Sequence, residues 1–258
     1  MRKFLEHPAW VGHARIVHGF GTAFAGAAGL DAADEAAREA AKRRTLRAAI
    51  DEALALAGEG FARALTVKQV HGTDLLVLDR EVAVPISDTL ALDGMLTDRP
   101  GVLIGVKTAD CLPVLIAERD GRAVAAAHGG WRGLLAGIVE KTAAALGREF
   151  GCRPERLQVA LGPSARGCCY EVSPELAEQF KLAYGPSVLR EGQGKPHLDL
   201  AAVAAEAARR AGVPAENIAD VGACTICSES PRFYSWRRDG QKTGRLFSYI
   251  GLRPTGKT

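Results

Sequence analysis

The sequence predicts an α/β fold with a mixed sheet in a single domain, and three observations support this. Short apolar runs typical of buried strands occur among longer segments with helical periodicity, without strict alternation between the two. The chain has 258 residues, enough for one large domain or two small ones. No internal repeat and no linker rich in Pro, Gly or Ser divides it, so a single domain spanning residues 1–258 is the simplest prediction.

The first half of the chain is expected to contain one long helix and several strands. Residues 31–57 are rich in Ala, Glu and Arg and end at a glycine, which predicts a helix. Residues 64–72 and 74–79 are expected to be short strands on either side of His71 and Gly72.

Three further strands and three helices are expected after residue 100. The segments 101–106, 112–117 and 122–128 are apolar enough for strands buried on both faces. Helices are then indicated by apolar residues at helical spacing, a serine cap followed by proline, and an aspartate cap with a terminal glycine. These three helices are expected within residues 133–151, 173–185 and 199–213.

Charge and hydropathy exclude several classes of protein. With 33 basic and 30 acidic residues the net charge is +3, too small to indicate nucleic acid as the main partner. The longest apolar runs are five or six residues, too short to span a bilayer. The N-terminal segment carries charges and Pro8 where a signal peptide needs an apolar stretch, so a cytoplasmic location is expected. The six cysteines of the chain are then expected to be reduced, metal-bound or catalytic.

Cys111 and His128 are predicted to be neighbours across a hairpin. Asp120-Gly121 lies between two strand candidates and is a strong hairpin signal. If these two residues form the turn, opposed positions sum to 241, so Pro113 faces His128. Cys111 then lies on the same strand face as Pro113, diagonal to His128 and about 7–8 Å from it at the backbone.

His71 is the best candidate for a third ligand, because it is expected at a strand end beside a glycine. His71, Cys111 and His128 would form a His₂Cys site with a fourth position open to water or substrate, the catalytic type of zinc centre. Spacing leaves two other interpretations open: Cys111 as a packed core thiol, or as a nucleophile with His128 as its base. Such a donor set also suits Cu²⁺.

Other residues are candidates for substrate contact or proton transfer. Asp110 is either a proton carrier or orienting group, or a solvated loop acid. In "GGWRG", Trp131 and Arg132 could stack on a base and hold an anion, or the segment only turns into the next helix. In "FYSWRRDGQKTGR", Arg237 and Arg238 indicate an anion-binding loop or a solvated hairpin at Asp239-Gly240.

The remaining cysteine motifs are ambiguous. Cys224 and Cys227 form a C-x₂-C, and Cys168 and Cys169 are adjacent. Together they could form a four-cysteine zinc site, although adjacent cysteines fit a tetrahedral site poorly. A redox C-x₂-C at a helix start is also possible, but the residues that follow do not have a helical pattern.

Several motifs in order make the chain resemble the YfiH-type laccase-domain family, also called multicopper polyphenol oxidase-like or purine nucleoside phosphorylase family. They are "KQVHGTDL", "DGMLTDRPGVLIGVKTADCLPVLI", "AAAHGGWRG", "LGPSARGCCYEV", "LDL" and "CTICSESPRFYSWRRDGQKTGR". Two departures are visible: the family's N-terminal "TRxGG" is "GTAFAGAAG" here and lacks the arginine, and "HAGWRG" is "HGGWRG".

The resemblance implies a layered α/β sandwich of mixed sheets flanked by helices, with catalytic zinc on His71, Cys111 and His128. It also implies phosphorolysis of purine nucleosides and adenosine deamination, on a small-molecule substrate with phosphate. Editing of peptidoglycan precursors by an amidase or hydrolase is a second implied activity. Copper-dependent oxidation of polyphenols is a third, and six histidines are too few for a multicopper cluster.

Overall fold

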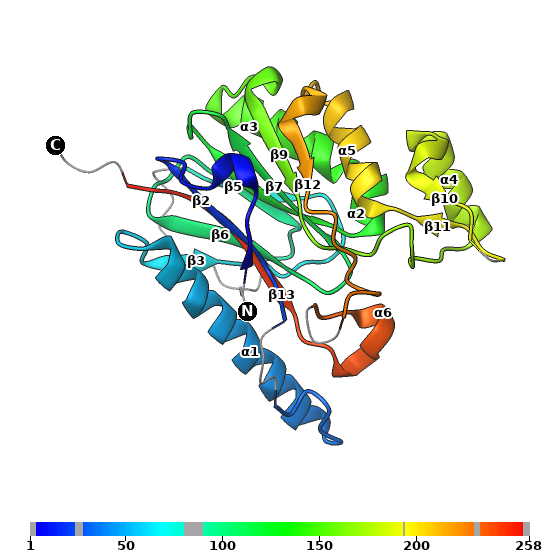
Figure 1. The fold of residues 1–258 in the computed structure, drawn as a ribbon. Helices are drawn as coiled ribbons and strands as arrows, with labels where there is room; N and C mark the ends of the chain where they lie inside the picture. Colours follow the sequence, from blue (N-terminus) through cyan, green and yellow to red (C-terminus); the bar gives the residue numbers. More distant parts are fainter. Residues whose placement is uncertain (1–3, 24–27, 80–89, 193, 230–232, 255–258) are drawn as a thin grey trace.

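Two mixed β-sheets packed face to face form the centre of the protein in the computed structural model (Figure 1). The structure describes residues 4–23, 28–79, 90–192, 194–229 and 233–254. The larger sheet has the spatial order β12 (Ile218–Asp220), β9 (Leu157–Leu161), β7 (Leu112–Glu118), β8 (Val124–Gly129), β5 (Gly94–Thr97) and β4 (Leu75–Leu78). The second sheet has the order β1 (Phe4–Leu5), β2 (Ile16–Gly21), β13 (Leu246–Leu252), β6 (Val102–Thr108) and β3 (Arg63–Leu65). A separate pair joins β10 (Leu189–Arg190) to β11 (His197–Leu198).

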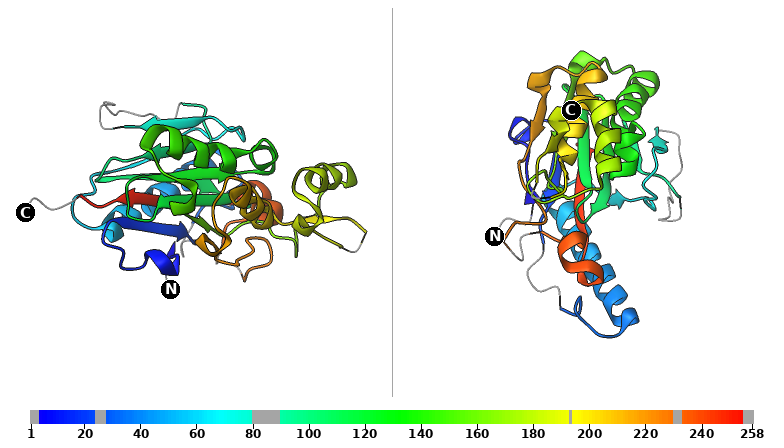
Figure 2. Two further views of the ribbon diagram at one scale, coloured as in Figure 1. Left: turned by 90° about the horizontal axis from the view of Figure 1, so that it is seen from above. Right: turned by 90° about the vertical axis from the view of Figure 1, so that its right-hand side faces the viewer.

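Helices cover the outer faces of both sheets. The α-helices are α1 (Glu35–Ala57), α2 (Trp131–Leu135), α3 (Ile138–Phe150), α4 (Pro174–Tyr184), α5 (Leu200–Arg210) and α6 (Trp236–Asp239). Short 3₁₀ turns are η1 (Pro8–Trp10), η2 (Pro154–Arg156), η3 (Pro186–Val188), η4 (Ala215–Asn217) and η5 (Gly240–Lys242). Figures 1 and 2 show α1 along the second sheet and α3 and α5 on the opposite side of the molecule. The predicted α/β fold with mixed sheets and flanking helices is therefore confirmed.

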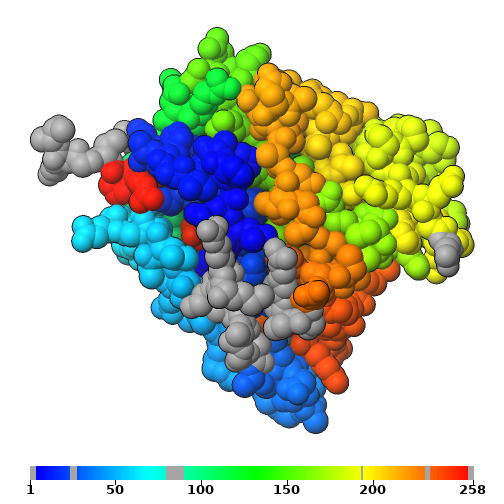
Figure 3. Space-filling model, viewed as in Figure 1, coloured from blue at the N-terminus to red at the C-terminus, as the bar shows by residue number. Residues whose placement is uncertain are grey.

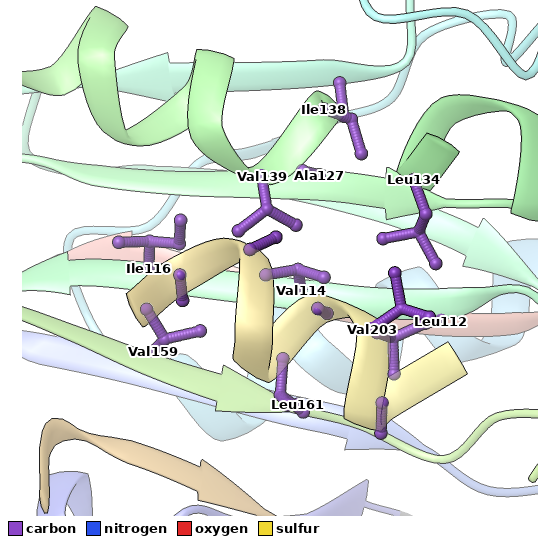
Figure 4. Packing of buried hydrophobic residues seen from close by; sticks show 14 of the residues in the cluster. Leu112, Val114, Ile116, Ala127, Leu134, Ile138, Val139, Val159, Leu161 and Val203 are labelled. Atoms are coloured by element: carbon purple, nitrogen blue, oxygen red, sulfur yellow. The ribbon is translucent and has the colours of Figure 1, made fainter. Parts of the chain in front are cut away.

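The alternation of side chains along β7 explains this layering. Val114 and Ile116 point toward α3 and α5, where they pack with residues such as Val139 (Figure 4). Leu115 and Ala117 point the other way, into the apolar layer between the two sheets. Since successive strand residues face opposite sides, an uninterrupted apolar strand can only be buried between two layers. Burying each large aliphatic side chain contributes about 1.5–3 kcal/mol.

Several predicted elements form with different bounds. The predicted helix of residues 133–151 is broken, because Gly137 takes a left-handed conformation (φ 84°) between α2 and α3. The predicted strand of residues 64–72 ends at Leu65, and only Lys68 makes a further bridge, to Ala91. The proposed hairpin at Asp239-Gly240 is wrong, since these residues end α6 and begin η5.

The N-terminal segment "GTAFAGAAG" departs from the family pattern, and its residues 24–27 lie outside the described residues. Within the described part of the chain, none of the helices has the length and apolar character needed to cross a membrane.

Candidate metal centre and its pocket

The hairpin register brings Cys111 and His128 together as predicted. Pro113 pairs with His128 and Leu112 pairs with Gly129, so opposed positions sum to 241. The connection is longer than two residues, because strand pairing begins only at Ala117 and Val124. The register and not the turn type decides which side chains meet, so the juxtaposition survives this difference.

His71 completes the group from a separate loop. Its Nε2 lies 3.8 Å from the Cys111 sulfur, and its ring centroid lies 4.9 Å from that of His128. One ligand atom from each of the three residues lies within 4.8 Å of the others. Two strand ends and one loop thus present a thiol and two imidazoles to a common point.

Asp93, immediately before β5, holds both histidines. Its Oδ1 accepts a hydrogen bond of 2.8 Å from Nδ1 of His128 and another of 2.8 Å from the backbone N–H of His71. Its Oδ2 accepts from the backbone N–H of Gly72 at 2.6 Å. An ionised carboxylate only accepts hydrogen bonds, so Nδ1 of His128 carries a proton, and Nε2 is the nitrogen left to bind a metal ion.

Hydrogen bonds at the site oppose the effect of burial on the pKa values of Cys111 and His128. Burial would raise the pKa of Cys111, but hydrogen bonds with His128 and His71 lower it to about 6. Burial would lower the pKa of His128, but hydrogen bonds with Asp93 and Cys111 raise it to about 9. Without a metal, thiolate and imidazolium therefore stabilise each other near neutral pH.

The donor set fits a metal ion with one open position. Three protein ligands, two nitrogens and one sulfur, are characteristic of catalytic zinc centres. Gly130 keeps the space beside them clear: a Cβ there would lie 2.8 Å from Cδ2 of His71 and 3.4 Å from the Cys111 sulfur. A side chain at residue 130 would therefore crowd two of the three ligands.

Backbone strain is concentrated at the same place. His71 (φ 64°) and Asp110 (φ 91°) are non-glycine residues with positive φ. The Asp110 carboxylate accepts hydrogen bonds of 2.6 Å from the Thr225 hydroxyl and 2.6 Å from the backbone N–H of Arg237. Such conformations cost of order 1–3 kcal/mol and persist where surrounding contacts hold them, often at functional sites.

A pocket of about 650 Å³ opens above the three ligands. One of its walls is α1, which contributes residues such as Arg43 and Leu46, and another is formed by Tyr170 and Trp236. Its cationic lining residues are Lys42, Arg43, Lys68, Lys107, Arg237 and Arg245, against the acids Glu39 and Asp110. The cavity therefore combines aromatic surface with an excess of positive charge.

The structure brings together only part of the predicted set. The residues His71, Cys111, His128, Asp110 and Arg237 all line this pocket. By contrast, Trp131 and Arg132 lie in α2, where the guanidinium of Arg132 is 4.2 Å from the Trp131 ring, and they are not lining residues.

Arg238 also lies outside the lining of the pocket. Its guanidinium donates hydrogen bonds to the carboxylate of Asp239 and to the backbone carbonyls of Thr225, Ile226 and Phe233. Contact of Trp131, Arg132 and Arg238 with substrate stays a prediction.

Sequence reasoning missed Asp93 and most of the cations. Asp93 is separated from His128 by 35 residues, and only its place in the motif "DGML", before a strand, could have drawn attention to it. Lys68 and Lys107 lie on neighbouring segments linked by Gln69, whose side chain bonds the backbone N–H and carbonyl of Lys107. No spacing along the sequence indicates that α1 borders the pocket.

Comparison with protein families gives a match over most of the chain. Residues 24–253 match the family described as "Multi-copper polyphenol oxidoreductase laccase". A "Purine nucleoside phosphorylase" of Deinococcus radiodurans is 37% identical over 213 residues, which cover 82% of this chain and 78% of that protein. An "Adenosine deaminase RL5" from an unknown prokaryotic organism is 36% identical over 192 residues, covering 71% and 72% of the two chains.

Solved structures share the whole fold. The hypothetical protein YfiH of Bacillus licheniformis superposes with a TM-score of 0.79 at 26% identity, covering 98% of this chain and 97% of that one. YlmD of Geobacillus stearothermophilus gives a TM-score of 0.76 at 28% identity, with 98% and 97% coverage.

Proposed function

The chain belongs to the family described as multi-copper polyphenol oxidoreductase laccase, and on that premise we propose that it is a zinc-dependent enzyme of purine nucleosides. The proposed reactions are phosphorolysis of adenosine- or inosine-type nucleosides and deamination of adenosine. Both names occur among relatives that are 36–37% identical to this chain. The observation that carries the proposal is the position of the three ligands in a cationic pocket with aromatic walls.

The pocket supports a substrate of this class on chemical grounds. A purine presents a flat π surface, and the exposed indole of Trp236 and the ring of Tyr170 offer faces on which it can stack. Phosphate is a small dianion at neutral pH, and the side chains of Lys68, Lys107 and Arg237 surround the space with compensating charge. A reaction between a nucleoside and phosphate needs both features in one cavity.

The residues in and around the pocket would have distinct roles in metal and substrate binding. His71, Cys111 and His128 would hold zinc, which when bound supplies a Lewis acid at the polar end of the pocket. Asp93 would keep the His128 ring in the tautomer that coordinates. The Asp110 carboxylate orients the backbone of Arg237, whose guanidinium lies 5.0 Å from the Tyr170 ring and would contact the phosphate.

Zinc is proposed over copper as the resident ion. The His₂Cys donor set accommodates either, and copper binds more tightly in general. Among the described residues, however, just two groups of ligands converge, this one and a cluster made only of cysteines. The several histidine-bound coppers of a laccase thus find no counterpart in that part of the chain, and copper-dependent phenol oxidation is proposed as a side activity at most.

The test is product analysis with zinc-replete protein and adenosine, with and without phosphate, beside His71→Ala. Adenine formed only with phosphate, or inosine formed without it, and neither with the variant, would support the proposal. The same amount of product from His71→Ala, or none from zinc-replete wild type, would refute it.

One observation favours a second candidate, a cysteine-dependent amidase or hydrolase of peptidoglycan precursors. The lowered pKa of Cys111 beside His128 is the property of an activated nucleophile. Such an enzyme would keep its activity after removal of the metal by chelation, whereas the zinc enzyme would lose it. Cell-wall precursor hydrolysis that resists chelation and disappears in Cys111→Ser would establish this alternative.

A further inference from the structure

Four of the other five cysteines converge at a second place in the molecule. The adjacent parallel strands β9 and β12 end side by side, so the segments that follow them run together. Ser164 and Cys224 form a parallel bridge there, with a hydrogen bond of 3.0 Å from the backbone N–H of Thr225 to the Ser164 carbonyl. The segment after β12 runs over the surface of the protein, next to the one after β9 (Figure 3). This pairing places Cys224 and Cys227 opposite Cys168 and Cys169.

We propose that Cys168, Cys169, Cys224 and Cys227 bind a structural zinc ion. Their four sulfurs all lie within 4.8 Å of one another, and those of Cys168 and Cys227 are 3.7 Å apart. In a tetrahedral site with zinc–sulfur distances of about 2.3 Å, neighbouring sulfurs are about 3.8 Å apart. The spacing of this cluster is therefore close to that of a four-thiolate site.

A tight turn removes the objection to adjacent cysteines as ligands. The backbone N–H groups of Cys169 and Tyr170 both donate to the Arg166 carbonyl, at 2.9 Å each, so the chain coils at this point. In a regular strand the side chains of residues 168 and 169 would point in opposite directions. The turn instead brings both sulfurs to the same centre.

The surroundings suit a metal-bound thiolate better than packed thiols. Cys168 and Cys227 are exposed and Cys169 and Cys224 are half-buried, so apolar packing does not explain the cluster. The backbone N–H groups of Cys227, Ile226 and Arg166 lie close to the Cys224 sulfur. Donors of this kind stabilise a thiolate, and on binding each thiol would release its proton to solvent without any change of oxidation state.

This zinc site would act on the pocket through one loop. Thr225, between the two cysteines of the C-x₂-C, donates a hydrogen bond from its hydroxyl to Asp110, which precedes Cys111. The carbonyls of Thr225 and Ile226 accept hydrogen bonds from Arg238, next to Arg237. Since all four positions would be filled by protein, the second ion would have a structural role, and its loss would loosen the support of Asp110.

The experiment uses the full chain with Cys111→Ser, which removes the thiolate of the other centre. Zinc per chain is measured by elemental mass spectrometry, and the spectrum is recorded after replacement by Co²⁺. We expect intense thiolate-to-cobalt bands and one tightly bound zinc in this background. Both should disappear when Cys168→Ser and Cys227→Ser are added, and both should remain with Cys152→Ser, a matched change at the buried sixth cysteine.

A second measurement on wild-type protein covers the case in which the multiple variant does not fold. Alkylation of Cys168 and Cys227, both exposed, is followed by peptide mass spectrometry with zinc bound and after chelation. We expect at least about a tenfold faster reaction after chelation, because the metal shields the thiolates. The proposal is overturned by equal rates, by cobalt spectra without four-thiolate bands, or by disulfides among these cysteines in protein purified under reducing conditions. None of these outcomes depends on the nucleoside activity.

Discussion

The two clusters of candidate metal ligands in this protein are built on different supports. His71, Cys111 and His128 meet where two central strands end, and a buried carboxylate, Asp93, fixes two of them. The four cysteines lie on two loops at the edge of the same sheet, and a parallel bridge and a turn hold them together.

The difference indicates how each cluster is used. The strand-end cluster offers three ligands and lies at the bottom of a pocket. It would leave the fourth coordination position of a metal ion open for water or substrate, which a catalytic metal needs. The loop cluster supplies four ligands and would close around its ion, which suits a structural role. Asp110 and Thr225 connect the two.

The largest expected effect is the loss of catalysis at the strand-end cluster. Cys111→Ser should reduce turnover of adenosine by at least about a thousandfold, since the Lewis acid contributes several kcal/mol to lowering the barrier. Cys152→Ser removes a buried thiol outside both clusters and should leave turnover unchanged. Turnover and zinc content measured on both proteins test this, and an active Cys111→Ser enzyme would contradict it.

Removing the support of the ligands should have a smaller effect. Asp93→Asn should weaken zinc binding at the strand-end cluster by about 10–100-fold, because the amide replaces one of the two accepting oxygens with an N–H donor and removes the negative charge that fixes the tautomer of His128. Competition with a chromogenic chelator measures the affinity. The exposed Asp74→Asn is the control, as only its main chain contacts Asp93. Equal affinities would show that Asp93 serves the fold rather than the metal.

The hydrogen bond between Thr225 and Asp110, which connects the two clusters, can be removed by a near-isosteric substitution. Thr225→Val should lower the free energy of unfolding by about 1–3 kcal/mol, because Asp110 would keep a buried carboxylate oxygen without its 2.6 Å partner. It should also lower turnover while zinc remains bound. Urea denaturation gives the stability, and Thr142→Val, which loses a buried hydrogen bond inside α3, is the matched control. Unchanged turnover with lowered stability would separate the two clusters functionally.

The mildest test compares two thiols in metal-free protein. Cys111 has a pKa lowered to about 6 despite burial, because His128 and His71 hydrogen-bond to it. Burial raises the pKa of Cys152 to about 11, with Glu118 adding to the effect. The thiolate fraction rises with pH, so alkylation of Cys111 should increase through pH 6 and level off, while Cys152 stays unreactive at neutral pH. Peptide mass spectrometry across a pH series measures both, and a Cys111 midpoint near pH 9 would contradict the arrangement.

The sequence predicted one cluster well and the other poorly, for a physical reason. Within a hairpin, pairing two strands fixes every opposed position, so Asp120-Gly121 was enough to place His128 diagonal to Cys111. Loops have no such periodicity, and the turn that aligns Cys168 with Cys169 leaves no pattern in the residue types. The contact of α1 with the pocket also depends on packing of distant segments, as does the hydrogen bond from His128 to Asp93.

The position of β13 has a consequence for how the protein assembles as it is synthesised. This strand, the last one in the described chain, lies between β2 and β6 in the middle of its sheet, and the pocket residues Trp236, Arg237 and Arg245 come just before it. Until residues 246–252 leave the ribosome, the strand that lies between β2 and β6 and pairs with both is missing. Pairing between strands more than 200 residues apart is slow, so we expect binding of substrate to arise abruptly and late, once residues 246–252 have been synthesised, and not in stages as the preceding residues appear.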